Sequence, residues 1–225
     1  MISHKYKCIY LHIPKTAGSS IEKKLEHFDV LCEGVQDHRS IKCIEPLPIQ
    51  QIIANLSNGN DGYSRKAFLK YHLQQKLNVG SAITSEQYQQ YFKFTFVRNP
   101  WARAYSWYRN VMKSENKMMR LGIKNEIAFS DFIKNYPNQF ELRPQTHWIY
   151  NNKGNIPLDF IGKFERLDED FRFICDRLQL PDPTLPQILI GGNDHYTEHY
   201  DESTINLVYK MYKHEIDLFE YEYGV

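Results

Sequence analysis

The start of the chain places a strand, a tight loop and a helix in immediate succession, and this order restricts the fold more than any other feature. Residues 8–13 are rich in β-prone side chains and end at Pro14, which predicts a short strand. Ile21, Leu25 and Phe28 follow at the i, i+4, i+7 spacing of an amphipathic helix. Strand, loop and helix in this order open an α/β nucleotide-binding unit, so we expect an α/β fold.

The hydrophobic pattern of the rest of the chain predicts a single domain over residues 1–225. Further runs with the composition of strands lie at 67–73, 92–97 and 158–164. Segments with helical periodicity or capping signals are 49–56, the residues after Pro100, 168–178 and the residues after Asp201. Strands that alternate with helices predict a central parallel sheet flanked by helices on both faces.

The composition excludes several classes of protein. Hydrophobic residues make up 42% of the chain and the formal net charge is +1, so the surface as a whole is not built for nucleic acid. No apolar run approaches the ~18 residues of a membrane span, and the N-terminus lacks the apolar core of a signal peptide. The four cysteines have no C-x-x-C spacing. We therefore expect a reduced, cytoplasmic protein with no membrane span and no nucleic-acid partner.

The loop at 14–20 has the composition of an anion-binding turn. Its small residues let successive backbone N–H groups surround one anion, beside the N-terminus of the following helix. Lys15 adds a positive charge, and Ser19 and Ser20 add hydroxyl donors. The alternative is an ordinary turn with a solvated lysine. A Walker-type loop is excluded, because Lys15 precedes Gly18 and the chain contains no Gly-Lys-Ser/Thr.

A second candidate begins where the most apolar strand ends. Arg98 follows the strand at 92–97, at the edge where open α/β sheets bind ligands. Ser106 lies about two turns into the next helix, so its hydroxyl can face the same region. An arginine fork and a hydroxyl group suit a terminal phosphate. The alternative is a surface arginine that only pairs locally.

Together the two loops resemble the signatures of the PAPS-dependent sulfotransferases, in the carbohydrate-type branch of the heparan 2-O-sulfotransferases and their soluble bacterial relatives. The resemblance rests on His-Ile-Pro-Lys-Thr-Ala-Gly-Ser-Ser at 12–20 and Phe-Val-Arg-Asn-Pro-Trp-Ala-Arg-Ala-Tyr-Ser at 96–106. Segments 159–165 and 209–223 are also similar to the family, so the resemblance covers nearly the whole chain. Asn99 departs from the aspartate that is common at its position.

This resemblance implies a P-loop-like sulfotransferase fold and the donor 3′-phosphoadenosine 5′-phosphosulfate (PAPS). The residues implied to hold the 5′-phosphosulfate are Lys15, Thr16, Ala17, Gly18, Ser19 and Ser20. Arg98 and Ser106 are implied to hold the 3′-phosphate. Lys15 would also stabilise the leaving phosphate, and no metal ion is expected. The expected acceptor is a hydroxyl group of an oligo- or polysaccharide.

Sulfuryl transfer also needs a group that takes the acceptor's proton, and His72 is the expected base. A histidine is suited to this role near neutral pH. His72 lies near the end of the expected strand at 67–73, on its polar face, and the family uses a histidine in this segment. The alternatives are His12 and Glu22, or a solvated His72 with no role in catalysis.

Two other patterns bear on ligands. Residues 195–199 match the H-x-x-E-H pattern of zinc proteases, but Gly192 before them and Asp201 after them predict a loop, where both histidines cannot share a helix face. Residues that would suit a negatively charged sugar chain are Lys113, Lys117, Arg120, Lys124, Arg143 and Trp148, the last by stacking. For the basic side chains, a solvated helix face is an equal alternative.

The expected function is therefore transfer of a sulfuryl group from PAPS to a carbohydrate hydroxyl. A nucleotide kinase or NTPase is the first alternative, since its sheet and phosphate loop would be similar. A non-catalytic module that binds nucleotide or carbohydrate is the second.

Overall fold

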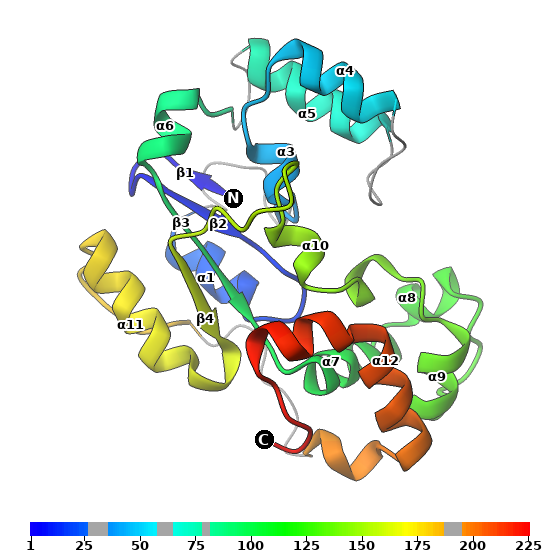
Figure 1. The fold of residues 1–225 in the computed structure, drawn as a ribbon. Coiled ribbons are helices and arrows are strands. Elements are labelled where there is room, and N and C mark those ends of the chain that lie inside the picture. Colours follow the sequence, from blue (N-terminus) through cyan, green and yellow to red (C-terminus); the bar gives the residue numbers. More distant parts are fainter. Residues whose placement is uncertain (27–35, 58–64, 78–81, 187–194) are drawn as a thin grey trace.

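The computed structural model describes residues 1–26, 36–57, 65–77, 82–186 and 195–225 (Figure 1). Its centre is a four-stranded sheet with the order β1-β2-β3-β4. The short β1 (Ile2–Ser3) runs antiparallel to β2 (Cys8–Leu11), whereas β2, β3 (Phe92–Val97) and β4 (Phe160–Lys163) are parallel. The expected α/β fold is confirmed, and its parallel sheet carries one short antiparallel strand at the edge.

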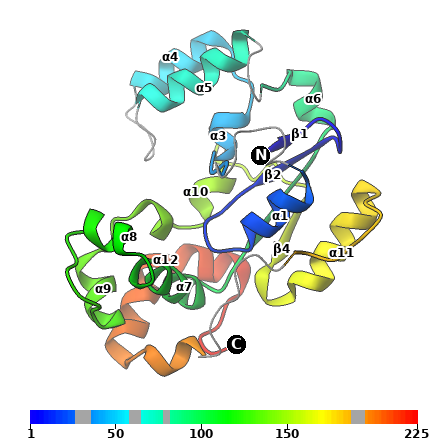
Figure 2. The same cartoon turned by 180° about the vertical axis from the view of Figure 1, so that it is seen from behind.

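Helices cover both faces of the sheet, as the sequence predicts. The covering helices are α1 (Gly18–Lys24), α7 (Pro100–Met112), α11 (Leu167–Leu178) and α12 (Glu202–Phe219). Side chains of β2 alternate between two hydrophobic clusters: Cys8 and Tyr10 pack with α1 and α11, whereas Ile9 and Leu11 pack with α7 and α12. Figure 2 shows α1 in front of the sheet when the molecule is seen from behind. Phe28, expected in the first helix, lies outside the described residues.

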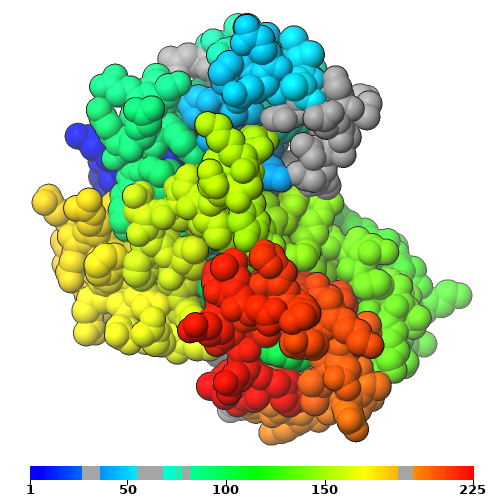
Figure 3. Space-filling model, in the orientation of Figure 1, coloured from blue at the N-terminus to red at the C-terminus, as the bar shows by residue number. Residues whose placement is uncertain are grey.

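Asn99 joins the start of α7 to the end of the chain. Its Oδ1 accepts a hydrogen bond from the backbone N–H of Trp101 at 3.1 Å and caps the helix, whose first residue is Pro100. Its Nδ2 donates to the carbonyls of Glu222 and Val225, at 2.8 and 3.1 Å. An aspartate could cap the helix but could not donate to these carbonyls, which gives a physical reason for asparagine here. In Figure 3 the C-terminal residues, coloured red, lie on the front surface.

The other helices lie around this sheet. Between β2 and β3 they are α3 (Ile41–Ile44), α4 (Ile49–Ser57), α5 (Arg65–Leu77) and α6 (Ser85–Gln90), at the top of Figure 1. Beyond α7 they are α8 (Glu115–Arg120), α9 (Phe129–Asn135), η1 (Phe140–Leu142), α10 (Thr146–Ile149), η2 (Phe164–Arg166) and η3 (Tyr196–His199). Within the described ranges, no helix is long and apolar enough to cross a bilayer.

The strand expected at 67–73 is wrong, because these residues belong to the helix α5. The alternation that predicted it places Leu69 and Leu73 four residues apart, and this spacing fits a helix as well as a strand. Over the whole of α5, lysine, leucine and glutamine, which favour helices, make up eight of the 13 residues. The helix expected at 49–56 is confirmed as α4.

Candidate functional site

The first predicted anion loop turns sharply between β2 and α1. Lys15 and Ala17 both have left-handed backbone conformations, with φ of 70° and 66°, and Ala17 precedes the first residue of α1. Such turns direct successive N–H groups toward one point. The hydroxyl of Thr16 is buried and donates to the carbonyl of Ile13 at 2.9 Å, so it holds the loop itself together. The loop therefore has the backbone form expected of an anion site.

Gly18 is required by a close approach to His12. A Cβ atom on Gly18 would lie 1.9 Å from both Cδ2 and Nε2 of the His12 ring, which no side chain can tolerate. His12 is buried and its Nδ1 lies 3.1 Å from Oε1 of Glu22, which is also buried. The two alternatives to His72 as base therefore form a buried pair beneath the loop.

Positive side chains gather around Lys15. Burial is the largest cause of a lowered pKa of Lys15, which falls to about 8. The charges of Arg98, Lys117 and Lys113 lower the same pKa, so each of these groups lies close enough to Lys15 to repel its charge. Bringing like charges together raises the free energy of the empty site, and a bound anion would relieve that repulsion.

Arg98 connects the second loop to the first. Its Nη1 donates to the backbone carbonyl of Lys15 at 3.3 Å, and its guanidinium carbon lies 4.0 Å from the centre of the Phe164 ring. Burial lowers the pKa of Arg98 to about 10, while the charge of Glu165 opposes that shift. Its Nε is buried and has no partner among the described residues. A buried donor of this kind is what an anionic ligand would bind.

Ser106 is not shown in contact with Arg98. It lies in α7, half-buried, and among the described residues no hydrogen bond connects its hydroxyl to Arg98. The structure thus brings Lys15 and Arg98 together, while a shared role for Ser106 stays a prediction.

Residues 36–38, to which the sequence assigned no role at the anion loops, pack over the first loop. Gln36 donates from Nε2 to the hydroxyl of Ser19. Nδ1 of His38 lies 2.9 Å from the carbonyl of His12, and the two imidazole rings are 4.2 Å apart. Burial is the largest cause of the lowered pKa of His38, at about 4. These residues lie in a polar stretch with no periodic pattern, so only the tertiary structure shows that they contact the loop.

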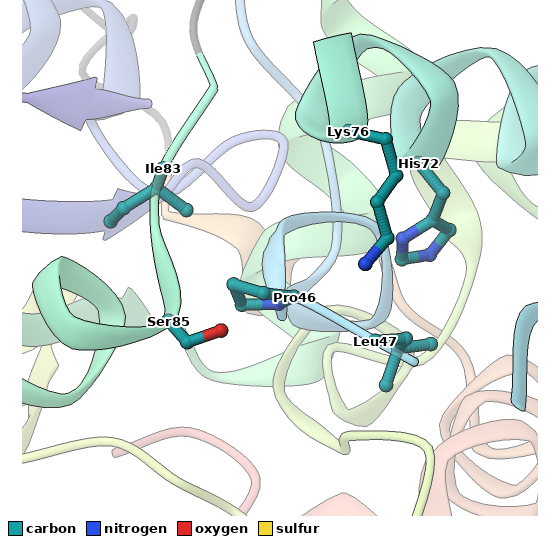
Figure 4. Close-up of a pocket in the computed structure, with 6 residues that line it drawn as sticks. All are labelled: Pro46, Leu47, His72, Lys76, Ile83 and Ser85. Carbon is teal, nitrogen blue, oxygen red and sulfur yellow. The ribbon is translucent and has the colours of Figure 1, made fainter. Parts of the chain in front are cut away.

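His72 lies elsewhere in the fold. It is on α5, 1% exposed, beside a pocket lined also by Pro46, Leu47, Lys76, Ile83 and Ser85 (Figure 4). Figure 4 shows the side chains of His72 and Lys76 extending from the same helix toward Pro46 and Leu47. Burial lowers the pKa of His72 to about 4. None of the residues that line this pocket belongs to either anion loop, and among the described residues no hydrogen bond or ring contact joins His72 to Lys15 or Arg98.

Two further sequence features, the H-x-x-E-H pattern at 195–199 and Trp148, can be compared with the structure. Residues 196–199 form the short 3₁₀ helix η3, and His199 stacks on Tyr105 with ring centres 4.5 Å apart. Across the described ranges, no three side chains of His, Cys, Asp or Glu form a group that could hold a metal ion. Trp148 cannot stack on a sugar as expected, because it is fully buried and its indole N–H donates to the carbonyl of His38 at 3.1 Å.

Comparisons with known proteins agree with these observations. Residues 1–222 match the model of the sulfotransferase family. The chain is 32% identical to carbohydrate sulfotransferase 14 of Danio rerio in an alignment of 209 positions that covers 80% of this chain and 48% of that protein. It is 25% identical to carbohydrate sulfotransferase 12 of Mus musculus in an alignment of 264 positions that covers 98% of this chain and 59% of that protein. The chain thus spans about half the length of these relatives. No solved structure matches it at a significant level.

Proposed function

The chain belongs to the sulfotransferase family, and from that premise we propose that it transfers a sulfuryl group from PAPS to a hydroxyl group of a carbohydrate. The main support for PAPS as the sulfuryl donor is the contact of Arg98 with Lys15, which joins two cationic loops into one site. The names of the relatives, carbohydrate sulfotransferases, support the acceptor class.

The charges of the site fit a nucleotide with phosphates at two positions. We place the 5′-phosphosulfate in the first loop, against Lys15 and the backbone N–H groups before α1. The 3′-phosphate would accept a hydrogen bond from the buried Nε of Arg98, which has no partner among the described residues. Lys113 and Lys117 add positive charge on the same side, since both lower the pKa of Lys15.

In the reaction, an acceptor oxygen forms a bond to sulfur while the bond from sulfur to the bridging oxygen of the 5′-phosphate breaks. The electron pair of the broken bond stays on that oxygen, which becomes more negative, and Lys15 stabilises it there. The acceptor's proton passes to a base. His72 stays our prediction for that base on the family resemblance alone, because its expected position at a strand end is wrong.

The proposal is tested by nucleotide binding. We expect 3′,5′-diphosphoadenosine to raise the melting temperature of the protein more than AMP does at equal concentration, with or without EDTA, because only the former has a 3′-phosphate. The variant Arg98→Ala should lose this preference. A matched control is Arg172→Ala, which removes an exposed arginine of α11. Equal shifts from both nucleotides with the wild type would overturn the assignment of the second loop.

The acceptor is tested by turnover. Labelled PAPS should transfer its label to at least one member of a panel of oligo- and polysaccharides. Donor binding without transfer to any of them would favour the non-catalytic module. Magnesium-dependent hydrolysis of ATP would instead favour the NTPase alternative.

A further inference from the structure

The side-chain amide of Gln145 forms hydrogen bonds with both the N–H and the carbonyl of the Arg98 backbone. The N–H of Arg98 donates to Oε1 of Gln145 at 2.8 Å, and Nε2 of Gln145 donates to the carbonyl of Arg98, also at 2.8 Å. Gln145 is fully buried. Its amide thus acts toward Arg98 as a neighbouring peptide group does in a sheet, just past the end of β3.

Glu215 of α12 fixes the orientation of this amide. Its Oε1 accepts the second hydrogen of Gln145 Nε2 at 3.1 Å, and its Oε2 accepts from the backbone N–H of Gln145. Glu215 is 1% exposed. Both amide hydrogens and the amide oxygen of Gln145 are therefore used, so only glutamine satisfies all of these partners. A glutamate in place of Gln145 would put a carboxylate oxygen, which cannot donate, against the carbonyl of Arg98 and Oε1 of Glu215.

The segment that carries Gln145 is itself held by two long helices. Arg103 of α7 donates to the carbonyls of Glu141 and Arg143 at 2.7 and 2.6 Å. The hydroxyl of Tyr212, on α12, donates to the carbonyl of Leu142 at 2.6 Å. Because these donors are anchored in the core, the position of Gln145 is set by the packed helices and not by its own short loop.

Glu165 also fixes the backbone next to Arg98. The next backbone N–H, that of Asn99, donates to Oε1 of Glu165 at 2.7 Å. With its backbone fixed on both sides, the guanidinium of Arg98 is directed toward Lys15, whose carbonyl it contacts at 3.3 Å.

We propose that Gln145 is a positioning residue that aims Arg98 and thereby sets the preference of the site for a nucleotide with a 3′-phosphate. This inference rests on the proposed function. Arginine has many rotamers, and a free Arg98 backbone would let the guanidinium leave the position where it meets the phosphate. Gln145 does not touch the nucleotide in this proposal; it acts through Arg98.

The test is the ratio of two dissociation constants, that of AMP over that of 3′,5′-diphosphoadenosine, measured by calorimetry on the full chain. In Gln145→Met this ratio should fall about tenfold, because hydrogen bonds to charged groups are the strong ones and depend on geometry. Affinity for AMP should change by no more than about twofold. If the role of Gln145 is purely structural, the variant should lose affinity for both nucleotides to the same extent or for neither.

Gln139→Met is the matched control. Gln139 accepts from the indole of Trp107 at 2.8 Å and donates to the carbonyl of Tyr136 at 2.7 Å, so the variant loses comparable hydrogen bonds away from Arg98. Its ratio should equal that of the wild type. In the background of Arg98→Ala, adding Gln145→Met should change the ratio no further.

A folded Gln145→Met that keeps the wild-type ratio overturns the inference. If that variant does not fold, Glu215→Gln takes its place, with the same expected direction and the same overturning result. The outcome is separable from the proposed function: a wild type with no preference for the 3′-phosphate rejects the function, whereas a wild-type preference that survives in the variant rejects only the role of Gln145.

Discussion

The guanidinium of Arg98 donates to the backbone carbonyl of Lys15 across 3.3 Å, although the two residues lie 83 positions apart in the chain. Lys15 follows β2 and Arg98 follows β3, and these strands are parallel neighbours. Parallel strands end at the same edge of a sheet, so the loops after them meet. The contact gives the two loops a common geometry, in which each cation constrains the other.

The first prediction separates the roles of these two cations. Lys15→Ala should lower kcat by ~10²–10³-fold, as the loss of one transition-state donor does, and weaken the binding of 3′,5′-diphosphoadenosine far less. Arg98→Ala should mainly weaken nucleotide binding, because its charge is assigned to a phosphate that does not react. Turnover and calorimetry on the same preparations measure both. If the two variants show the same loss in kcat and in affinity, the separate roles are wrong.

The second prediction concerns pH. The pKa of Lys15 is lowered to about 8, chiefly by burial, so the side chain is charged below that pH and neutral above it. Affinity for 3′,5′-diphosphoadenosine should therefore be level near pH 7 and fall as the pH rises through about 8. A bound anion favours the charged form, so binding near pH 8.5 should take up protons.

Calorimetry in two buffers of different ionisation enthalpy measures this proton uptake. Lys15→Arg keeps the charge at all accessible pH values and should bind without the uptake. Proton uptake of the same size in this variant would show that another group titrates.

The third prediction concerns the contact of Gly18 with His12. Because an added Cβ would lie 1.9 Å from the His12 ring, Gly18→Ala should destabilise the protein by about 1–3 kcal/mol, as overpacking of a core does. The ring cannot move freely, since it is buried and its Nδ1 lies 3.1 Å from Glu22. Urea unfolding measures the change.

The double variant Gly18→Ala/His12→Ala provides the control for that prediction. Removing the ring removes the collision, so the double variant should be less destabilised than the sum of the two single variants. Additive losses would mean that the glycine is needed for another reason.

Local patterns predicted the parts of the fold whose causes are local. The strand at 92–97 is rich in β-prone side chains, with apolar residues at four of its six positions, and it forms β3 over the same residues. Pro100 is the first residue of α7, as the preference of proline for that position predicts. The antiparallel β1 has only two residues, too few for any hydrophobic period to show. The wrong strand at 67–73 came from the opposite problem, a short alternation that a helix also satisfies.

The candidate site was predictable only where its residues lie on the two loops. Lys15 and Arg98 follow strands, and the carboxyl ends of parallel strands meet, so their proximity followed from sequence reasoning. Gln36, His38 and Gln145 belong to irregular segments, and their side chains reach the loops or support them only through long-range contacts. No spacing or composition signal distinguishes them from other polar loop residues.

The fourth prediction concerns His72, which lies buried on the helix α5 and not at the end of a strand as expected. If it is the base, His72→Ala should lose ~10²–10⁴-fold in turnover and keep nearly full donor affinity. Burial lowers the pKa of His72 to about 4, so the corresponding limb of the pH–rate profile should lie near pH 4 and not near neutrality.

The same burial affects stability, so the two effects must be measured separately. A histidine that is neutral in the folded state binds protons more readily when unfolded, so between its ordinary pKa near 6.5 and about 4 it lowers stability as the pH falls. His72→Ala should weaken this dependence. A folded His72→Ala with near-normal turnover would reject the base and leave the buried pair His12 and Glu22, which lies beneath the anion loop, as the groups to test next.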